Sequence, residues 1–171
     1  MYTSFNFDQQ EVDLQNWYYF TQGFTREELD KIEKDVATLP YQRATTAGGQ
    51  SKIRSSQIKW VPQNNEWFWL YEKLSDYAVQ ANFALWNFDL HAIPEQIQYT
   101  EYYATENGHY GWHHDVHWQS LANSDRKLSI TVQLSDPSEY EGGDFEFSEC
   151  DNPTSKEKGT IIVFPSYLSH R

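Results

Sequence analysis

The N-terminal half of the chain carries apolar residues at helical spacing in two stretches. The first begins at Thr25-Arg26-Glu27-Glu28, a capping box in which the Thr and Glu side chains bond backbone N–H groups at the helix start. Apolar residues then recur at near-helical spacing until Pro40, which predicts a helix over residues 25–38. A second helix is predicted over residues 65–85. Its apolar stripe, which we interpret as core packing, consists of Trp67, Leu70, Tyr71, Leu74, Ala78, Ala81 and Leu85.

Strand-like patterns occupy most of the remaining chain. Aromatic residues predict a strand over residues 17–24, and alternation predicts another over 52–62, with a polar loop over 41–51 between the first helix and this strand. After Pro94 the chain changes to short β-like runs separated by turn residues. The five predicted strands there are residues 97–104, 111–118, 127–135, 142–149 and 159–165. Helices followed by strands indicate an α+β domain, with helices bracing an antiparallel sandwich or barrel.

The length and composition of the chain exclude or disfavour several classes of protein. A chain of 171 residues fits a single domain, and an aromatic content of 17% is typical of a packed core rather than disorder. A net charge of -12 disfavours binding to a phosphate backbone. A single cysteine, Cys150, excludes an intrachain disulfide and a cysteine-rich zinc site. Because neither a signal peptide nor an apolar run of membrane-spanning length is visible, we expect a cytoplasmic protein with no membrane partner.

Candidate chemistry gathers in residues 102–118, which hold four of the six histidines. On a strand, side chains repeat with period 2, so His113 and Asp115 would point to the same face. A third ligand is available in His170, which follows the predicted strand 159–165 after a Pro turn. Two histidines and one carboxylate on one octahedral face form the arrangement of non-haem Fe(II) oxygenases, with positions left open for other ligands.

Two other interpretations of the histidines were weighed. His113 and His117 have the spacing of a helical zinc pair, but the catalytic Glu of H-E-x-x-H is absent and the flanking residues favour a strand. H-x-D motifs also recur by chance among surface polar residues. We interpret His109, His114 and His117 as such surface residues, because strand alternation points His114 away from His113 and His117 lies beyond Asp115.

Three segments, taken together, resemble a known enzyme family. They are YYATENGHYGWHHD, RKLSITVQLSDPSEYEGGDFEF and GTIIVFPSYLSHR, and their order and spacing are similar to those of 2-oxoglutarate/Fe(II)-dependent dioxygenases of the prolyl 4-hydroxylase type. KIRSSQIKWVP also resembles a strand of the oxygen-sensing prolyl hydroxylases and their bacterial relatives. The resemblance covers about residues 17–171 and is greatest to small bacterial or phage members. It implies a double-stranded β-helix, or jelly roll, braced by the N-terminal helices.

The resemblance also implies roles for individual residues. His113, Asp115 and His170 match the iron ligands, and Tyr103 matches a tyrosine that lines the co-substrate pocket. Gln133 falls where family members bind the far carboxylate of 2-oxoglutarate, and core packing is an equally good interpretation of it.

Tyr110 and Arg54 are substrate-pocket candidates. The loop 41–51 lies where relatives close over their target peptide, although it could equally be a surface loop without a role. Family members place a basic residue one strand beyond the distal histidine, whereas this sequence ends at Arg171. We therefore expect residues 1–171 to form a single dioxygenase domain that lacks its C-terminal strand.

The implied activity is hydroxylation of a prolyl residue in a peptide or protein. The implied cofactors and co-substrates are Fe(II), 2-oxoglutarate and O2, with ascorbate as reductant and succinate and CO2 as co-products. Two alternatives stay open: a hydroxylase of a free amino acid or small metabolite, and a non-catalytic metal-binding domain that kept the fold. Oxidative demethylation of nucleic acid is disfavoured by the net charge of -12. The sequence does not predict the oligomeric state.

Overall fold

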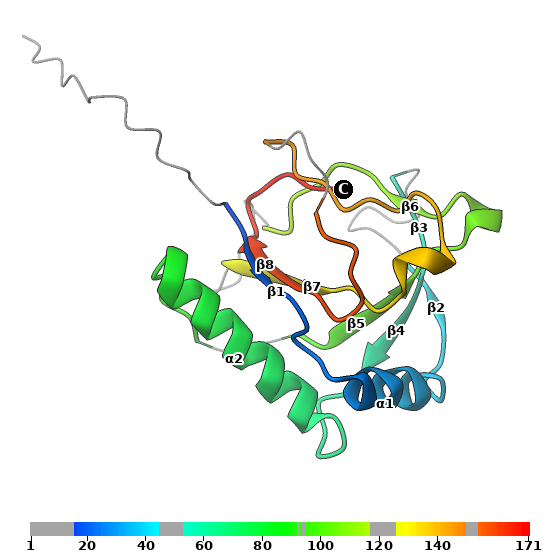
Figure 1. The fold of residues 1–171 in the computed structure, drawn as a ribbon, viewed down its shortest axis with the longest axis horizontal. Helices are drawn as coiled ribbons and strands as arrows, with labels where there is room; N and C mark the ends of the chain where they lie inside the picture. Colours follow the sequence, from blue (N-terminus) through cyan, green and yellow to red (C-terminus); the bar gives the residue numbers. More distant parts are fainter. Residues whose placement is uncertain (1–15, 45–52, 92, 94, 117–125, 150–153) are drawn as a thin grey trace, which may run out of the picture.

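A computed structural model describes residues 16–44, 53–91, 93, 95–116, 126–149 and 154–171, in which antiparallel sheets combine with two α-helices (Figure 1). Helix α1 spans Arg26–Val36, and the predicted capping box is confirmed: Thr25 Oγ1 accepts from Glu28 N at 3.2 Å, and Glu28 Oε2 accepts from Thr25 N at 2.8 Å. Helix α2 spans Phe68–Leu85. It begins after the predicted start because Asn64 Oδ1 caps the preceding turn, accepting from the N–H groups of residues 66 and 67.

The strands in the described part of the chain form three antiparallel sheets. The first has the order β1-β8-β7, the second β2-β4-β5, and β3 pairs with β6. Their bounds are β1 Tyr18–Phe20, β2 Gln42–Arg43, β3 Arg54–Ser55, β4 Gln57–Val61, β5 Ile97–Glu101, β6 His109–Tyr110, β7 Leu128–Val132 and β8 Ile161–Pro165, with 3-10 turns at Ala104–Glu106 and Pro137–Glu139. In the described residues no helix is both long enough and apolar enough to cross a bilayer.

Strand β8 is buried on both faces and separates two apolar clusters. Ile161 and Val163 pack into the larger cluster, together with residues of α1 and α2, whereas Ile162 and Phe164 pack into a smaller cluster with Phe147. The period of 2 along a strand produces this division, because successive side chains point to opposite faces. The first sheet therefore presents one face to the helices and the other to the second cluster.

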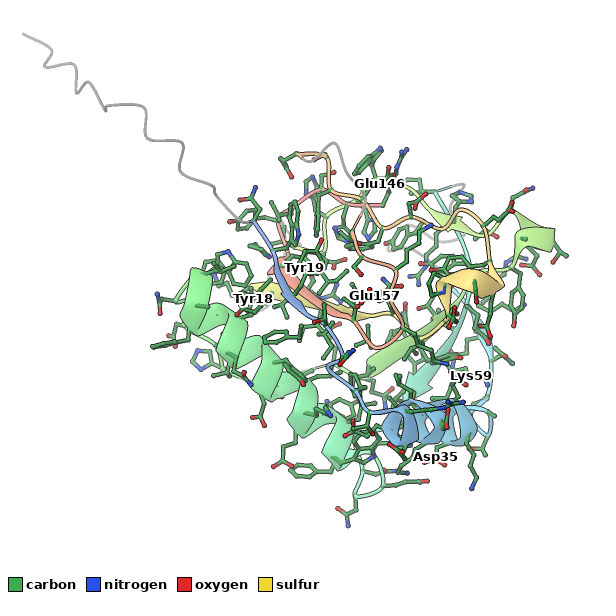
Figure 2. The ribbon with its side chains drawn as sticks, in the orientation of Figure 1. Tyr18, Tyr19, Asp35, Lys59, Glu146 and Glu157 are labelled. Atoms are coloured by element: carbon green, nitrogen blue, oxygen red, sulfur yellow. The ribbon has the colours of Figure 1, made fainter. Side chains whose placement is uncertain are left out.

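The helices lie at one end of the molecule, and the C-terminus lies at the other (Figure 1). Helix α2 runs along β1 on the outside of the first sheet, and α1 lies below β4. Lys59 on β4 is only 3% exposed, and its Nζ donates to the backbone carbonyl of Val36 at 2.9 Å. Figure 2 shows Lys59 near α1 and Glu146 at the opposite end. This hydrogen bond attaches the second sheet to the C-terminal end of α1.

Two predicted strands are wrong in the described residues. Residues 111–116 form no continuous ladder, because their N–H groups bond residues of two distant segments: Gly111 bonds Ile53, whereas His113 and Asp115 bond His170 and Ser166 in the segment after β8. Residues 142–149 are also largely irregular and pair only briefly, through an isolated bridge between Phe147 and His170. Residues 117–118 and Cys150 lie outside the described residues.

The strand predicted over 52–62 is divided into β3 and β4. Its two parts join different sheets, since Arg54 pairs with Tyr110 while Gln57 pairs with β2 and β5. Between them, the carbonyl of Ser56 accepts from Ala44 N at 3.1 Å. The predicted loop 41–51 contains β2 at its start, and its residues 45–51 are not among those described.

Candidate metal centre

His113, Asp115 and His170 lie together, with one ligand atom of each within 4.8 Å of the others. His113 Nε2 lies 3.6 Å from Asp115 Oδ1, and His170 Nε2 lies 3.7 Å from Asp115 Oδ2. Two segments supply these residues, and they are joined by a bridge in which His113 and His170 exchange backbone hydrogen bonds. The structure thus brings together the three residues that the sequence predicted as ligands.

Backbone carbonyls fix both histidine rings in the same tautomer. His113 Nδ1 lies 2.8 Å from the carbonyl of Gly111, and His170 Nδ1 lies 2.9 Å from that of Leu168. A carbonyl can only accept, so each Nδ1 carries the proton and each Nε2 presents a lone pair toward Asp115. Burial lowers the pKa of His113 and the nearby His170 lowers it further, although the bond to Gly111 opposes this shift. A neutral imidazole is the form that binds a metal.

Aromatic rings surround the distal histidine. His170 is 4% exposed, and its ring centroid lies 4.8 Å from that of Phe164 and 5.5 Å from that of Phe145. Phe147 lies at 6.4 Å and also pairs with His170 through the backbone. The smaller apolar cluster therefore forms a wall behind His170 and shields that side of the centre from water.

Tyr110 and Arg54, the substrate-pocket candidates, form a stack on His113. The rings of Tyr110 and His113 lie nearly parallel, with centroids 3.5 Å apart, and the Arg54 guanidinium lies 4.6 Å from the Tyr110 centroid. Arg54 also donates to Gln98 Oε1 at 2.6 Å and to Ser56 Oγ at 2.9 Å. The neutral side chains of Gln98 and Ser56 thus orient the half-buried Arg54 guanidinium beside the candidate metal centre.

Tyr103 and Tyr102 point to different sides of the segment that follows β5. The Tyr103 hydroxyl donates to Glu101 at 3.0 Å, on the face of the second sheet that carries Lys59. Tyr102 instead lies near Arg54 and Tyr110. Burial of its hydroxyl end raises the pKa of Tyr102, although half of the residue is exposed, and the Arg54 charge opposes the shift. Tyr102 thus approaches the Arg54–Tyr110 stack, whereas the Tyr103 hydroxyl is engaged with Glu101, and the predicted co-substrate role of Tyr103 stays a prediction.

Gln133 and the described histidines that we interpreted as surface residues lie outside the cluster of His113, Asp115 and His170. Gln133 follows β7, and its backbone pairs with Gly159 and Thr160, so alternation places its side chain on the same face as Ser129. His114 is exposed and bonds the carbonyl of Tyr167 at 2.8 Å. His109 bonds the carbonyl of Asn107, and His117 lies outside the described residues.

Arg171 is engaged away from the two histidines. Its Nε donates to Glu146, and its guanidinium lies 4.8 Å from the Trp112 ring centroid.

Two serines that contact the candidate ligand Asp115 were not identified from the sequence. Ser129 Oγ, on β7, donates to Asp115 Oδ2 at 2.6 Å, and it lies 3.1 Å from Ser166 Oγ. Ser166 is 1% exposed, and its carbonyl accepts from the N–H groups of Asp115 and Val116 at 2.9 and 3.1 Å. Ser129 belongs to the polar face of an alternating strand, and that alternation is the signal that could have identified it.

The donor set fits a divalent transition metal. Two imidazole nitrogens and one carboxylate suit iron, and the set supplies only three of six octahedral positions. Each histidine has a fixed tautomer, and the carboxylate has a hydroxyl partner, as outer contacts of metal ligands usually provide. Such a centre could bind an ion and still accept a chelating co-substrate.

The three candidate ligands lie in a region that matches a known family of sequences. The sequence profile of the 2OG-Fe(II) oxygenase superfamily matches residues 97–171, which include all three ligands. A PKHD-type hydroxylase of Rippkaea orientalis is 29% identical over 154 residues, which are 86% of this chain and 67% of the relative. A PKHD-type hydroxylase of Prochlorococcus marinus is 39% identical over 82 residues, which are 46% of this chain and 36% of that relative.

Solved structures share the fold. A prolyl-4-hydroxylase of Pseudomonas putida superposes with a TM-score of 0.70 at 15% identity, over 91% of this chain and 83% of the other. A collagen prolyl hydroxylase of Paramecium Bursaria Chlorella virus-1, solved as a 2OG complex, gives 0.68 at 18%, over 94% and 90% of the two chains. Together, the sequence profile and the PKHD-type relatives show that residues 97–171 carry a 2OG-Fe(II) oxygenase domain and support a 2-oxoglutarate-dependent dioxygenase, whereas the solved structures show the shared fold.

Proposed function

We propose that this protein is an Fe(II)- and 2-oxoglutarate-dependent hydroxylase that acts on prolyl residues of a peptide or protein. His113, Asp115 and His170 would hold the Fe(II) ion, and the open half of its coordination sphere would accept 2-oxoglutarate and O2. The bound iron supplies the oxidising chemistry, in which 2-oxoglutarate yields succinate and CO2 and a C–H bond becomes C–OH. Ascorbate would keep the iron reduced. We also propose that the antiparallel sheets form a double-stranded β-helix.

The protein's own contribution is positioning and exclusion of water. The carbonyls of Gly111 and Leu168 orient the two imidazoles, and the rings of Phe145 and Phe164 cover one side of His170. We assign Gln133 to the co-substrate side of the centre, because it continues the face of β7 that carries Ser129. Tyr103 is the weaker candidate there, since its hydroxyl bonds Glu101.

The observation that best supports a peptide substrate is a set of exposed apolar residues on the segments next to the centre. We define the apolar rim as Ile53, Tyr102, Trp112 and Tyr167, which are 50%, 49%, 44% and 47% exposed. Each is attached to the metal segment. Trp112 precedes His113, the Ile53 carbonyl accepts from Gly111, the Tyr167 carbonyl accepts from His114, and Tyr102 approaches Arg54 and Tyr110.

Exposed apolar side chains grouped in this way are typical of macromolecular binding surfaces, whereas a small metabolite is usually enclosed. Arg54 lies beside Tyr102 of the apolar rim, with its guanidinium stacked on Tyr110. We propose that it binds a carbonyl or carboxylate oxygen of the substrate, because guanidinium N–H groups bond such oxygens in a fixed geometry. Free amino acid hydroxylation is the second candidate, and the same Arg54 cation favours it, since a free amino acid always carries a carboxylate.

The test is substrate-stimulated succinate formation. The protein is incubated with Fe(II), ascorbate and 2-oxoglutarate, and succinate is measured with proline-containing peptides, with matched alanine peptides, and with free proline. The proposal predicts stimulation by proline peptides and hydroxyproline in the product. Stimulation by free proline alone would support the metabolite reaction instead. His113→Ala should abolish turnover, whereas His114→Ala, the adjacent histidine outside the cluster, is the matched control and should retain it.

A further inference from the structure

The carboxylate of Asp115 is held by a hydroxyl from a different part of the chain. Ser129 lies on β7, fourteen residues beyond Asp115, and its Oγ donates to Asp115 Oδ2 at 2.6 Å. Ser129 occupies the face of β7 opposite Leu128 and Ile130, which pack into the larger apolar cluster. A short bond between a hydroxyl and a carboxylate is charge-assisted and about twice as strong as a neutral one.

This bond makes the two carboxylate oxygens unequal. Oδ2 accepts the Ser129 proton, whereas Oδ1 lies 3.6 Å from His113 Nε2 and has no such hydroxyl donor among the described contacts. An oxygen that already accepts a strong hydrogen bond is a weaker metal donor than its neighbour. Oδ2 also lies 3.7 Å from His170 Nε2, so the two oxygens are similarly close to the histidine nitrogens and the Ser129 bond is what distinguishes them. Oδ1 is therefore the stronger donor to an ion.

Ser166 orients Ser129 in turn. Their Oγ atoms lie 3.1 Å apart, and the single Ser129 proton is already donated to Asp115. Ser166 must therefore be the donor to Ser129, which gives a directed chain from Ser166 through Ser129 to Asp115. Ser166 is 1% exposed, so water does not compete with this arrangement at its end of the chain.

Separate contacts hold the Asp115 main chain. Its N–H donates to the Ser166 carbonyl at 2.9 Å, and its carbonyl accepts from Arg126 Nη1 at 3.3 Å. Arg126 is anchored by a two-pronged ion pair with Glu95. These bonds fix the backbone but leave the carboxylate free to rotate about its side-chain torsions. Among the contacts of the described residues, the Ser129 hydroxyl is the one that limits this rotation.

We propose that Ser129 is a positioning residue that makes Asp115 a one-oxygen ligand, and that the Ser166 hydroxyl orients Ser129 for this role. The inference rests on the proposed iron centre. A carboxylate that bound through both oxygens would occupy a position that a chelating 2-oxo acid and O2 require. Ser129 would thus preserve three open positions and strengthen metal binding, as hydrogen-bond partners of metal ligands commonly do.

Metal binding to three variants tests the proposal. Anaerobic Co(II) titrations of Ser129→Ala, Ser129→Thr and Ser166→Ala would be compared with the wild type. Ser129→Ala should bind Co(II) about 10- to 100-fold more weakly. Ser129→Thr keeps the hydroxyl and should rescue binding to near the wild-type value, whereas Ser166→Ala should show a smaller loss. The visible spectrum of the Co(II)-loaded Ser129→Ala protein should shift toward a higher coordination number, and added 2-oxoglutarate should perturb it less.

The outcomes separate this inference from the proposed function. Wild-type affinity and an unchanged Co(II) spectrum in Ser129→Ala would overturn the role of Ser129 while leaving the metal centre intact. Equal losses in Ser129→Ala and Ser129→Thr would overturn it too, because packing rather than the hydroxyl would then be responsible. A wild-type protein that binds no Co(II) would remove the metal centre itself. If Ser129→Ala fails to fold, Ser166→Ala decides the question, and full wild-type affinity in that variant would overturn the proposed chain.

Discussion

The backbones of His113 and His170 exchange two hydrogen bonds of 3.0 Å each, which makes a two-residue bridge out of segments 57 positions apart. The ring centroids of the two histidines are 4.1 Å apart, and both Nε2 atoms face Asp115. The same His170 also pairs with Phe147. One residue thus joins the metal segment, the 145–148 segment and the end that follows β8.

Metal binding should stabilise the protein through these three ligands. An ion that binds only the native state at 100 times its Kd contributes about 2.7 kcal/mol to the free energy of unfolding. We expect Mn(II) to raise the Tm of the wild type and of His114→Ala, but not that of His113→Ala or His170→Ala. Differential scanning fluorimetry with and without EDTA checks this. An equal rise in Tm for His113→Ala would mean that the ion binds elsewhere.

The ring of Tyr110, rather than its hydroxyl, should support the centre. The ring stacks on His113 at 3.5 Å between centroids, and such pairs contribute about 0.5–1.5 kcal/mol. Tyr110→Phe is expected to keep the Co(II) affinity of the wild type, and Tyr110→Ala to weaken it up to about tenfold, as measured by titration. If Tyr110→Phe lost affinity to the same extent as Tyr110→Ala, the stacking explanation would be wrong.

The capping box should contribute to global stability without affecting the centre. Thr25 Oγ1 accepts from Glu28 N at 3.2 Å at the start of α1, far from the three ligands along the chain. Replacing an N-cap Thr by Ala typically costs about 1 kcal/mol. Urea unfolding of Thr25→Ala should show a loss of about this size, with unchanged Co(II) affinity. Thr25→Ser, which keeps the hydroxyl, is the control and should unfold like the wild type.

Gly108 should not tolerate a side chain. A Cβ at this position would lie 2.7 Å from the backbone N of Tyr103 and 2.9 Å from the carbonyl carbon of Tyr102. Backbone atoms cannot move aside cheaply, so Gly108→Ala is expected to destabilise the fold by about 1–3 kcal/mol in chemical unfolding. Gly142 has open space around its Cβ but a φ of +73°, so a loss there would come from backbone strain alone. Unfolding of Gly108→Ala at the wild-type urea midpoint would contradict the close contact.

Local signals in the sequence predicted the helices and several strands. The capping box and apolar spacing of α1, and the continuous apolar run of β8, are each visible within a dozen residues. The strand over 111–118 was wrong because its hydrogen bonds run to three partners distant in sequence, Ile53, Ser166 and His170. The alternation pattern still predicted correctly that the side chains of His113 and Asp115 lie together. Two residues of one bent segment can point to the same place even where the segment forms no strand ladder.

The parts of the site that the sequence did not predict depend on contacts between segments that are distant along the chain. Ser129 and Ser166 meet Asp115 only because β7 and β8 pair in one particular register, with Ser129 opposite Phe164. Which of Tyr102 and Tyr103 approaches the Arg54–Tyr110 stack similarly depends on which face of β5 turns toward it. A one-residue step reverses that face, and nothing in the local pattern decides it.

Conversion of 2-oxoglutarate to succinate tests the account most directly. The wild-type protein and Asp115→Ala would be assayed side by side with Fe(II), O2 and ascorbate, with His114→Ala as the control. The account predicts succinate from the wild type and from His114→Ala, in both cases abolished by EDTA, and a loss of at least about 100-fold in Asp115→Ala. Succinate formation by Asp115→Ala at the wild-type rate would contradict the assignment of His113, Asp115 and His170 as the iron centre.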